Sequence, residues 1–288
     1  SWVRTKCPDC GGDALRDTNT MAGFACSSWY FLRFASPKYA DGPFDPEAVR
    51  YWLPVDLYVG GAEHAVMHLL YARFWTKVMY DAGMVDFQEP FRVLLNQGML
   101  LGADHQKMSK SRGNVVTPDD MVQKYGVDAL RLYILFMGPF EAELEWSEEG
   151  IAGTYRFLRR VWNIVVETQA APLLPRDADF EKDLKYQLAR TVRKVTQDID
   201  TFQFNTGVAA MMEFVNFLAA NREEAGTCLQ VWREALRDLL VMMAPMTPFI
   251  SEELGRRCGF TTGDASIHTM PWPECVECRG RRRTKSRP

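Results

Sequence analysis

The 288-residue sequence has an ordinary globular composition, with 47% hydrophobic residues, 25% charged residues and a formal net charge of −3. Its longest apolar stretches fall short of the ~18–20 residues that a membrane-spanning helix needs, and its N-terminus has no signal-peptide core, so we expect a soluble cytoplasmic protein without a membrane partner. The length predicts more than one domain. The last ten residues hold six of the 34 basic residues, so the overall charge gives no indication of nucleic-acid binding, and anion recognition must come from local clusters.

Residues 1–24 are polar and contain the turn CPDCGG, which predicts a small ribbon. Cys7 and Cys10 have the spacing of one half of a tetrahedral zinc site, which needs a second pair. The other CxxC string, at 275–278, lies beyond two predicted domains, so a pair upstream of this sequence is the better expectation for the remaining Zn²⁺ ligands. Seven cysteines, an odd number, in a chain without a secretory signal predict reduced thiols in the cytosol.

A strand–helix–strand pattern follows. VDLYVGG at 55–61 predicts an apolar strand that ends in two glycines, EHAVMHLLYARFWTKVMYDAG predicts a long helix that stops at Gly83, and FRVLLNQGML predicts a second buried strand. Such a βαβ unit implies a parallel sheet covered by helices.

The predicted helix places His64 and His68 four residues apart on one face, just after the two glycines. They are interpreted in three ways: as satisfied polar residues of an amphipathic helix, as a metal pair, or as part of a substrate pocket. A metal pair lacks the intervening Glu of a zinc protease and a nearby third ligand. A pocket at the carboxyl end of the strand is where open α/β sheets bind ligands.

The loop HQKMSKSRGN at 105–114 packs three cations and two hydroxyls into the six positions from Lys107 to Arg112, with Gly102 and Gly113 on either side. Composition alone favours a solvated charged loop, and the pattern of a Walker loop is missing. The ordered string KMSKS is more specific than its composition.

The remaining chain has helical patterns only. Thr117 is a plausible N-cap with Pro118 in the first turn, and DALRLYILF predicts a second helix before the Gly/Pro-marked connection GPFEAELEWSEEG, a predicted domain boundary. Four amphipathic segments after Ser147 predict an antiparallel helical bundle. The basic tail is expected to be disordered.

KMSKSRGNVV at 107–116 resembles the signature loop of class I aminoacyl-tRNA synthetases, and DLYVGGAEHAVMHLLYARFW at 56–75 is similar to the leucyl-tRNA synthetase version of the preceding segment. The resemblance covers about residues 5–273. It implies an α/β Rossmann-like half-domain with a parallel sheet, followed by an all-α helical bundle of the anticodon-binding type. The implied domains are a partial zinc-ribbon-like segment (1–24), the second half of the catalytic domain (25–103), the KMSKS loop with a connective stem-contact region (104–146), the anticodon-binding domain (147–272) and the tail (273–288).

The resemblance also implies a leucine–tRNA ligase reaction, in which leucine is activated by ATP with Mg²⁺ and transferred to tRNA(Leu). Lys107 and Lys110 would be the catalytic groups that close on the phosphates, with the flanking glycines as hinges. The implied ATP-binding residues are Gly61, Glu63, Gln97, Lys107, Met108, Ser109, Lys110 and Ser111. The implied leucine pocket consists of Phe24, Ser27, Tyr30, Tyr58, His64 and His68. On the helices, Arg156, Arg159, Arg160, Arg190, Arg193 and Lys194 are candidates for tRNA phosphate contacts, against the alternative of a solvated face.

Class I enzymes also need an HxGH-type motif, and the four histidines, at 64, 68, 105 and 268, lie in no such string. We therefore expect the C-terminal portion of a synthetase, without the HxGH half and the editing domain, that is inactive or weakly active alone and has the N-terminal catalytic half as a partner. The alternatives are a noncatalytic tRNA- or RNA-binding module and a defective product without function.

Overall fold

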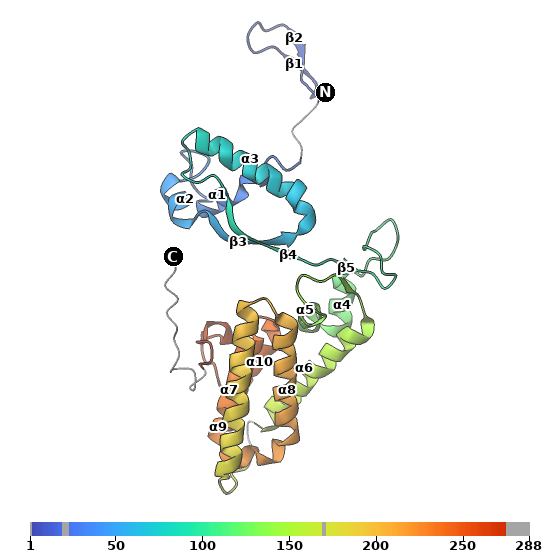
Figure 1. Ribbon diagram of the computed structural model, residues 1–288, viewed down its shortest axis with the longest axis vertical. Coiled ribbons are helices and arrows are strands. Elements are labelled where there is room, and N and C mark those ends of the chain that lie inside the picture. Colours follow the sequence, from blue (N-terminus) through green and yellow to red (C-terminus); the bar gives the residue numbers. More distant parts are fainter. Residues whose placement is uncertain (1, 19–22, 169–170, 275–288) are drawn as a thin grey trace. The chain divides into compact units, whose positions relative to one another are not determined.

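The computed structural model describes residues 2–18, 23–168 and 171–274, and the chain divides into two compact units, Ser1–Gln97 and Gly98–Pro288 (Figure 1). The CxxC string at 275–278 and almost all of the basic tail lie outside the described residues. The domain bounds implied by the resemblance stay predictions. Within the described part of the chain, no helix is long and apolar enough to cross a membrane.

The N-terminal ribbon is a short antiparallel hairpin. Strand β1 (Arg4–Lys6) pairs with β2 (Asp13–Leu15), with Arg4 opposite Leu15. The connecting loop holds both cysteines and is closed by two backbone hydrogen bonds, from the Cys7 amide to the Gly12 carbonyl and from the Gly11 amide to the Cys7 carbonyl, each 2.9 Å long.

The remainder of the first unit contains the predicted βαβ arrangement. Strand β3 (Val55–Gly61) runs parallel to β4 (Phe91–Gln97), and helix α3 (His68–Asp81) connects them. Burial of Phe31, Leu32, Ala72 and Met79 forms the core between α3, β4 and the preceding helices. Those preceding elements are η1 (Ser27–Trp29), α1 (Tyr30–Ala35) and α2 (Pro46–Trp52).

The single long helix predicted from Glu63 onward is wrong in one respect. The chain leaves β3 in a tight 3₁₀ turn, η2 (Ala62–Val66), and Met67 then adopts φ −118° and ψ −103°, outside the helical region, before α3 begins. The break has no Gly or Pro, so hydrophobic periodicity could not indicate it. The predicted stop is confirmed: α3 ends at Asp81, and Gly83 takes the left-handed conformation with φ +69°.

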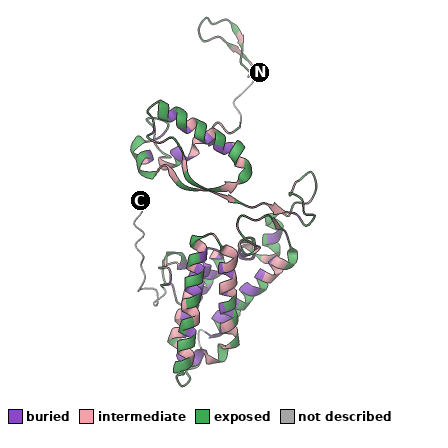
Figure 2. Ribbon diagram, in the orientation of Figure 1, coloured by how far each residue is buried: buried purple, intermediate pink, exposed green. Residues whose placement is uncertain are grey.

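The sheet of the first unit is unusually exposed. Among the described residues, no third strand joins β3 and β4. Figure 2 shows exposed positions along both strands and along α3. The exposed apolar side chains are Leu57, Val59, Val93 and Leu94 on the strands and Val66, Leu70, Phe74 and Val78, four residues apart, on η2 and α3. Together these side chains are called the open apolar surface, which includes both sides of the sheet because neighbours on a strand, such as Val93 and Leu94, point to opposite sides.

The second unit begins with a compact connective region. Strand β5 (Leu100–Leu101) pairs in parallel with β6 (Leu144–Glu145), and α4 (Pro118–Tyr125) and α5 (Val127–Phe136) lie between them in sequence. The first residue of this unit is tightly packed: the Gly98 amide donates to the Phe140 carbonyl at 2.9 Å, and a Cβ at position 98 would lie 1.7 Å from the Ala142 carbonyl oxygen. Only glycine fits there.

The helical bundle contains the four predicted helices. These are α6 (Glu148–Thr168), α7 (Ala178–Asp200), α8 (Phe204–Ala220) and α9 (Leu229–Met243). A further helix, α10 (Pro248–Arg257), was not predicted, and short 3₁₀ turns η3 (Arg222–Cys228) and η4 (Ile267–Thr269) complete the unit. Trp232 is fully buried at the centre of the bundle core and donates its indole N–H to Thr168 Oγ1 at 2.8 Å.

Candidate functional site

The carboxyl ends of the two parallel strands lie side by side. Gly60 pairs with Asn96 and Gly61 with Gln97, so these four residues form one edge of the sheet, where ligands bind in open α/β folds. The Glu63 carboxylate lies directly over the end of β3: a Cβ added to Gly61 would be only 2.3 Å from Glu63 Oε2. The structure therefore brings together the three ATP-binding candidates of the first unit, Gly61, Glu63 and Gln97.

Beside this edge, His68 is the centre of an aromatic cluster. Its ring centroid lies 5.7 Å from that of Tyr30, 5.9 Å from that of Tyr58 and 6.2 Å from that of His64. The Phe24 and Phe91 rings each lie 6.5 Å away. Five of the six residues predicted for the leucine pocket thus meet in space, and Phe91 joins them.

The sixth, Ser27, donates its hydroxyl to the Phe24 carbonyl at 3.3 Å, on the exposed side of η1. Phe91 was not predicted, because the contacts of a strand residue depend on how its strand is paired, and the sequence does not give that register. In the register of the strand pair Phe91 lies opposite Val55, and its ring contacts that of Tyr58 farther along β3, with 4.6 Å between the ring centroids.

The two histidines are short of hydrogen-bond partners. Nδ1 of His64 and Nδ1 of His68 are buried without a hydrogen-bond partner in the described structure. Burial, and then the neighbouring His64, lowers the pKa of His68 below its ordinary value, so the ring is neutral at neutral pH. The cluster is mainly aromatic and contains the neutral imidazole of His68, a set of groups suited to an apolar side chain.

In the second unit, the loop 102–114 is held by its own polar groups. Asn114 Nδ2 donates to both carboxylate oxygens of Asp104 at 3.0 Å, and Asn114 Oδ1 accepts the Ser109 amide at 2.8 Å. The Ser109 and Ser111 hydroxyls lie 2.8 Å apart. Sequence reasoning missed Asp104 and Asn114, which bracket the KMSKS string at both ends.

The side chains of the two catalytic candidates take no part in these hydrogen bonds. Lys107 and Lys110 are exposed, and in the described residues no carboxylate forms an ion pair with either. Met108 between them packs against the core of the connective region. The loop therefore has an anchored apolar side and two unpaired ammonium groups in solvent, an arrangement suited to phosphate oxygens.

A second contact ties the loop to β6. His105 Nδ1 lies 2.6 Å from Glu145 Oε1, and His105 has a positive φ of 59°. The hydrogen bond to Glu145, together with the charge of that carboxylate, raises the pKa of His105.

Cys7 and Cys10 fit one half of a metal site. Backbone N–H groups of Cys10 and Asp9 lower the pKa of the Cys7 thiol by hydrogen bonding to its sulfur, which favours the thiolate that binds zinc. No group of three or more His, Cys, Asp or Glu side chains suited to a metal occurs within residues 2–18, 23–168 and 171–274. The pair Cys7 and Cys10 as half of a zinc site therefore stays a prediction.

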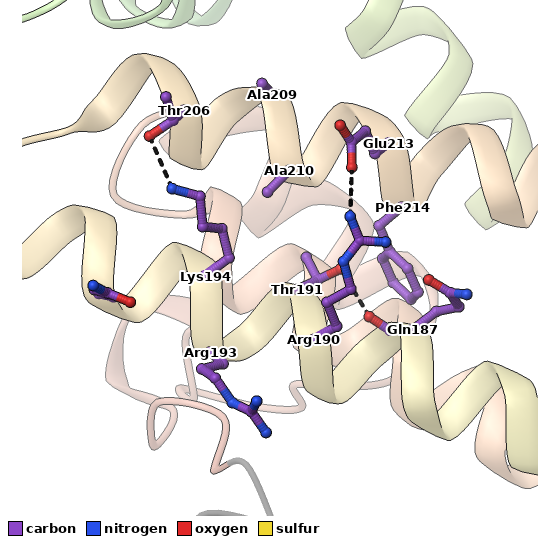
Figure 3. Close-up of a pocket in the computed structure, with 11 residues that line it drawn as sticks. Gln187, Arg190, Thr191, Arg193, Lys194, Thr206, Ala209, Ala210, Glu213 and Phe214 are labelled. Atoms are coloured by element: carbon purple, nitrogen blue, oxygen red, sulfur yellow. Dashed lines mark hydrogen bonds and ion pairs between the residues drawn. The ribbon is translucent and has the colours of Figure 1, made fainter.

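The bundle has a polar groove between α7 and α8, with a volume of about 530 Å³ (Figure 3). Its cations are held by neighbours: Arg190 lies 3.3 Å from Glu213, and Lys194 lies 2.7 Å from the buried Asp198. Figure 3 shows Arg193 pointing away from α8. On α6, Arg156 and Arg159 are exposed, and Arg160 donates to Asn216.

Two family models match the chain: that of the class I tRNA synthetases for isoleucine, leucine, methionine and valine at residues 24–147, and that of the anticodon-binding domain of tRNA ligases at residues 181–284. A leucine–tRNA ligase of Dehalococcoides mccartyi is 50% identical over 276 residues, which are 96% of this chain and 33% of that protein. A leucine–tRNA ligase of Petrotoga mobilis is 47% identical over 284 residues, 95% of this chain and 34% of that protein.

Solved structures agree with these matches. A leucyl-tRNA synthetase of Agrobacterium radiobacter, in a ternary complex with tRNA and LeuAMS, superposes with a TM-score of 0.84 at 38% identity over 96% of this chain and 36% of its own. A methionyl-tRNA synthetase of Mycobacterium tuberculosis bound by methionyl-adenylate shares the fold, with a TM-score of 0.62 at 19% identity over 85% of this chain and 50% of its own.

The parallel strand pair, the KMSKS loop and the helical bundle together define the architecture of a class I aminoacyl-tRNA synthetase. Within that class, the chain belongs to the leucyl-tRNA synthetase family. It spans about a third of the length of the curated relatives it matches.

Proposed function

We propose that this chain supplies the KMSKS side of the leucine-activating site, together with a tRNA-binding bundle, of a leucine–tRNA ligase. The observation that carries the proposal is the loop 102–114, which is held by the Asp104–Asn114 hydrogen bonds while Lys107 and Lys110 stay exposed and unpaired.

In the proposed reaction, a leucine carboxylate oxygen attacks the α-phosphorus of ATP, the bond to the bridging oxygen breaks, and pyrophosphate leaves with that oxygen. The product is leucyl-adenylate, and the leucyl group then passes to the terminal ribose of tRNA(Leu) with release of AMP. Lys107 and Lys110 stabilise the charge that develops on the phosphate oxygens, and Mg²⁺ accompanies ATP as part of the substrate. Glu63, Gly61 and Gln97 contact the nucleoside at the strand ends.

The leucine side chain occupies the aromatic cluster around His68 in this proposal. Tyr30, Tyr58, Phe24 and His64 supply a mostly apolar lining, and the neutral His68 adds no charge that would favour a polar amino acid. Such a pocket separates aliphatic side chains by only ~1–3 kcal/mol per methylene, so the cluster selects the size and apolar character of the amino acid more sharply than its branching.

The open apolar surface supports the proposed partner. Strand and helix side chains such as Val93, Leu94 and Phe74 are exposed next to strand edges with free peptide groups. Surfaces of this kind are normally covered by further strands or helices. We propose that the HxGH half of the catalytic fold packs there, whether it comes from the same polypeptide or a separate one.

The test is leucine-dependent exchange of labelled pyrophosphate into ATP. The 288-residue chain alone should give little or no signal. Co-expression with the part of the Dehalococcoides ligase that this chain does not cover, with association verified by gel filtration, should restore exchange. The double variant K107A/K110A should lower the restored rate by at least a hundredfold, whereas K38A, at an exposed lysine of the first unit, should leave it unchanged.

Robust exchange by the chain alone contradicts the need for a partner. Equal rates for the complex with and without Lys107 and Lys110 contradict the role of the loop.

A second candidate function, a noncatalytic RNA-binding module, is favoured by the exposed α6 arginines Arg156 and Arg159. Salt-dependent tRNA(Leu) binding by the chain, with no exchange in the associated complex, would select this function over leucine activation.

A further inference from the structure

A surface groove with aromatic walls lies where α5 and α10 begin and α6 passes between them. It has a volume of about 370 Å³, within the ~300–1,000 Å³ range typical of small-ligand sites. We call it the aromatic groove and define it by Tyr125, Tyr155, Arg159, Trp162 and Phe249. It lies wholly in the second unit and brings together helices from either side of residues 148–180, which neither matched family model covers.

Helical spacing explains the wall that α6 contributes. Tyr155, Arg159 and Trp162 follow each other at intervals of four and three residues, so they share one face of that helix. The Tyr125 ring meets Tyr155 edge-on, with 6.0 Å between ring centroids. From α10 the groove is lined by Phe249, whose side chain is 66% exposed. Such exposure is high for a large aromatic residue in the first turn of a packed helix.

The cation of the groove lining is Arg159. Across the described residues, no carboxylate pairs with Arg159. Two further cations lie over aromatic rings at its edge: the Lys124 ammonium is 5.1 Å from the Tyr125 centroid, and the Arg257 guanidinium carbon is 4.9 Å from the Trp162 centroid. Each of them also pairs with a carboxylate, Lys124 with Glu148 and Arg257 with Glu253, so Arg159 is the cation that the groove offers to an anion.

The one carboxylate that lines the groove is already committed. Asp128 accepts the amide N–H of Ile250 at 2.7 Å and that of Phe249 at 3.4 Å, which caps the first turn of α10. The groove thus offers aromatic faces and the guanidinium of Arg159, and two backbone N–H groups partly offset the charge of its lining carboxylate, Asp128.

We propose that the aromatic groove binds one unpaired nucleotide of the tRNA. The base stacks on Tyr155 and Phe249, and the adjacent phosphate pairs with Arg159. Aromatic platforms interleaved with cations are the arrangement that single-stranded nucleic acid requires, because every base has a π face and every linkage has a negative charge. The inference rests on the proposed tRNA binding and adds a defined subsite to it.

The polar groove between α7 and α8 fits this ligand less well. Glu213 and Asp198 hold Arg190 and Lys194 there, so a phosphate would have to compete with carboxylates already in place. An aliphatic protein segment would fit the walls of the aromatic groove but would leave the Arg159 charge without a partner.

The experiment measures binding of a tRNA(Leu) transcript to the 288-residue chain by filter retention at several salt concentrations. F249A and Y155A should each weaken binding by about five- to a hundredfold with an unchanged salt dependence, because stacking involves no counterion. R159A should weaken binding and reduce the slope of log K against log salt by about 0.7–0.9. The control Y186A removes a comparably exposed aromatic ring from α7, outside the groove, and should have no effect.

A second arm separates stacking from general backbone attraction. A short single-stranded RNA should compete with tRNA for the unaltered chain but not for F249A, and a duplex of equal charge should compete poorly. F249L retains apolar bulk without a π face and guards against a folding artefact, so it should behave like F249A while its unfolding curve matches that of the unaltered chain.

Each contrary result has a distinct meaning. If the unaltered chain does not retain tRNA, the proposed tRNA binding is overturned, and the subsite with it. If tRNA binds and F249A, F249L and Y155A match the unaltered chain, only the subsite is overturned. If these variants instead change the oligomeric state of the free chain, the groove is a protein contact and the nucleotide proposal is wrong.

Discussion

Asn114 bonds through both ends of its amide: Nδ2 donates to both carboxylate oxygens of Asp104 at 3.0 Å, and Oδ1 accepts the Ser109 amide at 2.8 Å. We expect N114A to release the loop. Trypsin should then cleave after Lys107, Lys110 and Arg112 several times faster, and the Ser109 amide should exchange its hydrogen faster. N163A, at an exposed α6 position, is the matched control. Unchanged cleavage in N114A would show that Met108 alone anchors the loop.

The His105–Glu145 pair should make the attachment of the loop to β6 sensitive to pH. Its hydrogen bond to Glu145 raises the pKa of His105 above 6.5, its ordinary value. A raised pKa in the folded state means that the contribution to stability is complete below pH 6.5 and is lost as the pH rises through the folded-state pKa.

An NMR titration of the His105 ring should give a pKa above 6.5 in the unaltered chain and a lower one in E145Q. Asp104 is the other carboxylate that favours the charged ring, so D104N should lower the pKa of His105 by less. Equal values in the unaltered chain and in E145Q would contradict the pairing.

The Cys7 thiol should react at a lower pH than an ordinary cysteine thiol. The backbone N–H groups of Cys10 and Asp9, and the Cys10 side chain, lower the pKa of the Cys7 thiol below its ordinary value of 9.0. Alkylation followed by mass spectrometry across a pH series should show Cys7 half-modified at a lower pH than in the variant C10A. A coincident pH profile for the two chains would show that the side chain of Cys10 has no part in the effect.

Trp232 should be the most sensitive position of the bundle core. W232A removes a fully buried indole and should destabilise the second unit by ~3–5 kcal/mol. W232F keeps most of the packing, loses the hydrogen bond to Thr168 and should cost ~1–2 kcal/mol. Urea unfolding followed by helical circular dichroism measures both. W52A, at a 64% exposed tryptophan of the first unit, should leave that transition in place.

The elements with regular periodicity could be predicted from the sequence. Strands β3 and β4 and helices α6 to α9 carry apolar residues at spacings of two or of three and four, and these spacings reflect local geometry. The break at Met67 could not be predicted, because a 3₁₀ turn and an α-helix place apolar residues almost alike over five positions. Helix α10 is short, and a proline such as Pro248 can mark either the first turn of a helix or the end of the preceding one.

In the candidate site, too, local patterns could be recognised in the sequence and long-range contacts could not. Loop 102–114 and the residues around His68 were predicted from resemblance to the synthetases, and the roles of these residues stay predictions. The contacts that these residues make could not be predicted from the sequence. Asp104 and Asn114 are ten positions apart in a loop without periodicity, and Phe91 reaches His68 only through the register of a strand pair. Tyr155 and Phe249 are nearly a hundred positions apart, so no local pattern could place them in one groove.

Gly98 gives the chain a point of extreme mutational intolerance that requires no ligand contact, although its neighbour Gln97 is a proposed nucleoside contact. Even alanine would place its methyl group 1.7 Å from the Ala142 carbonyl oxygen, a collision with backbone that no side-chain rotation relieves. A saturation scan scored for function should therefore show a column of losses at this position as deep as that at Lys107, while the neighbouring Met99 tolerates other apolar residues. A scan of that kind, interpreted without coordinates, would assign Gly98 to the active site, although close backbone packing is sufficient to explain why glycine is required there.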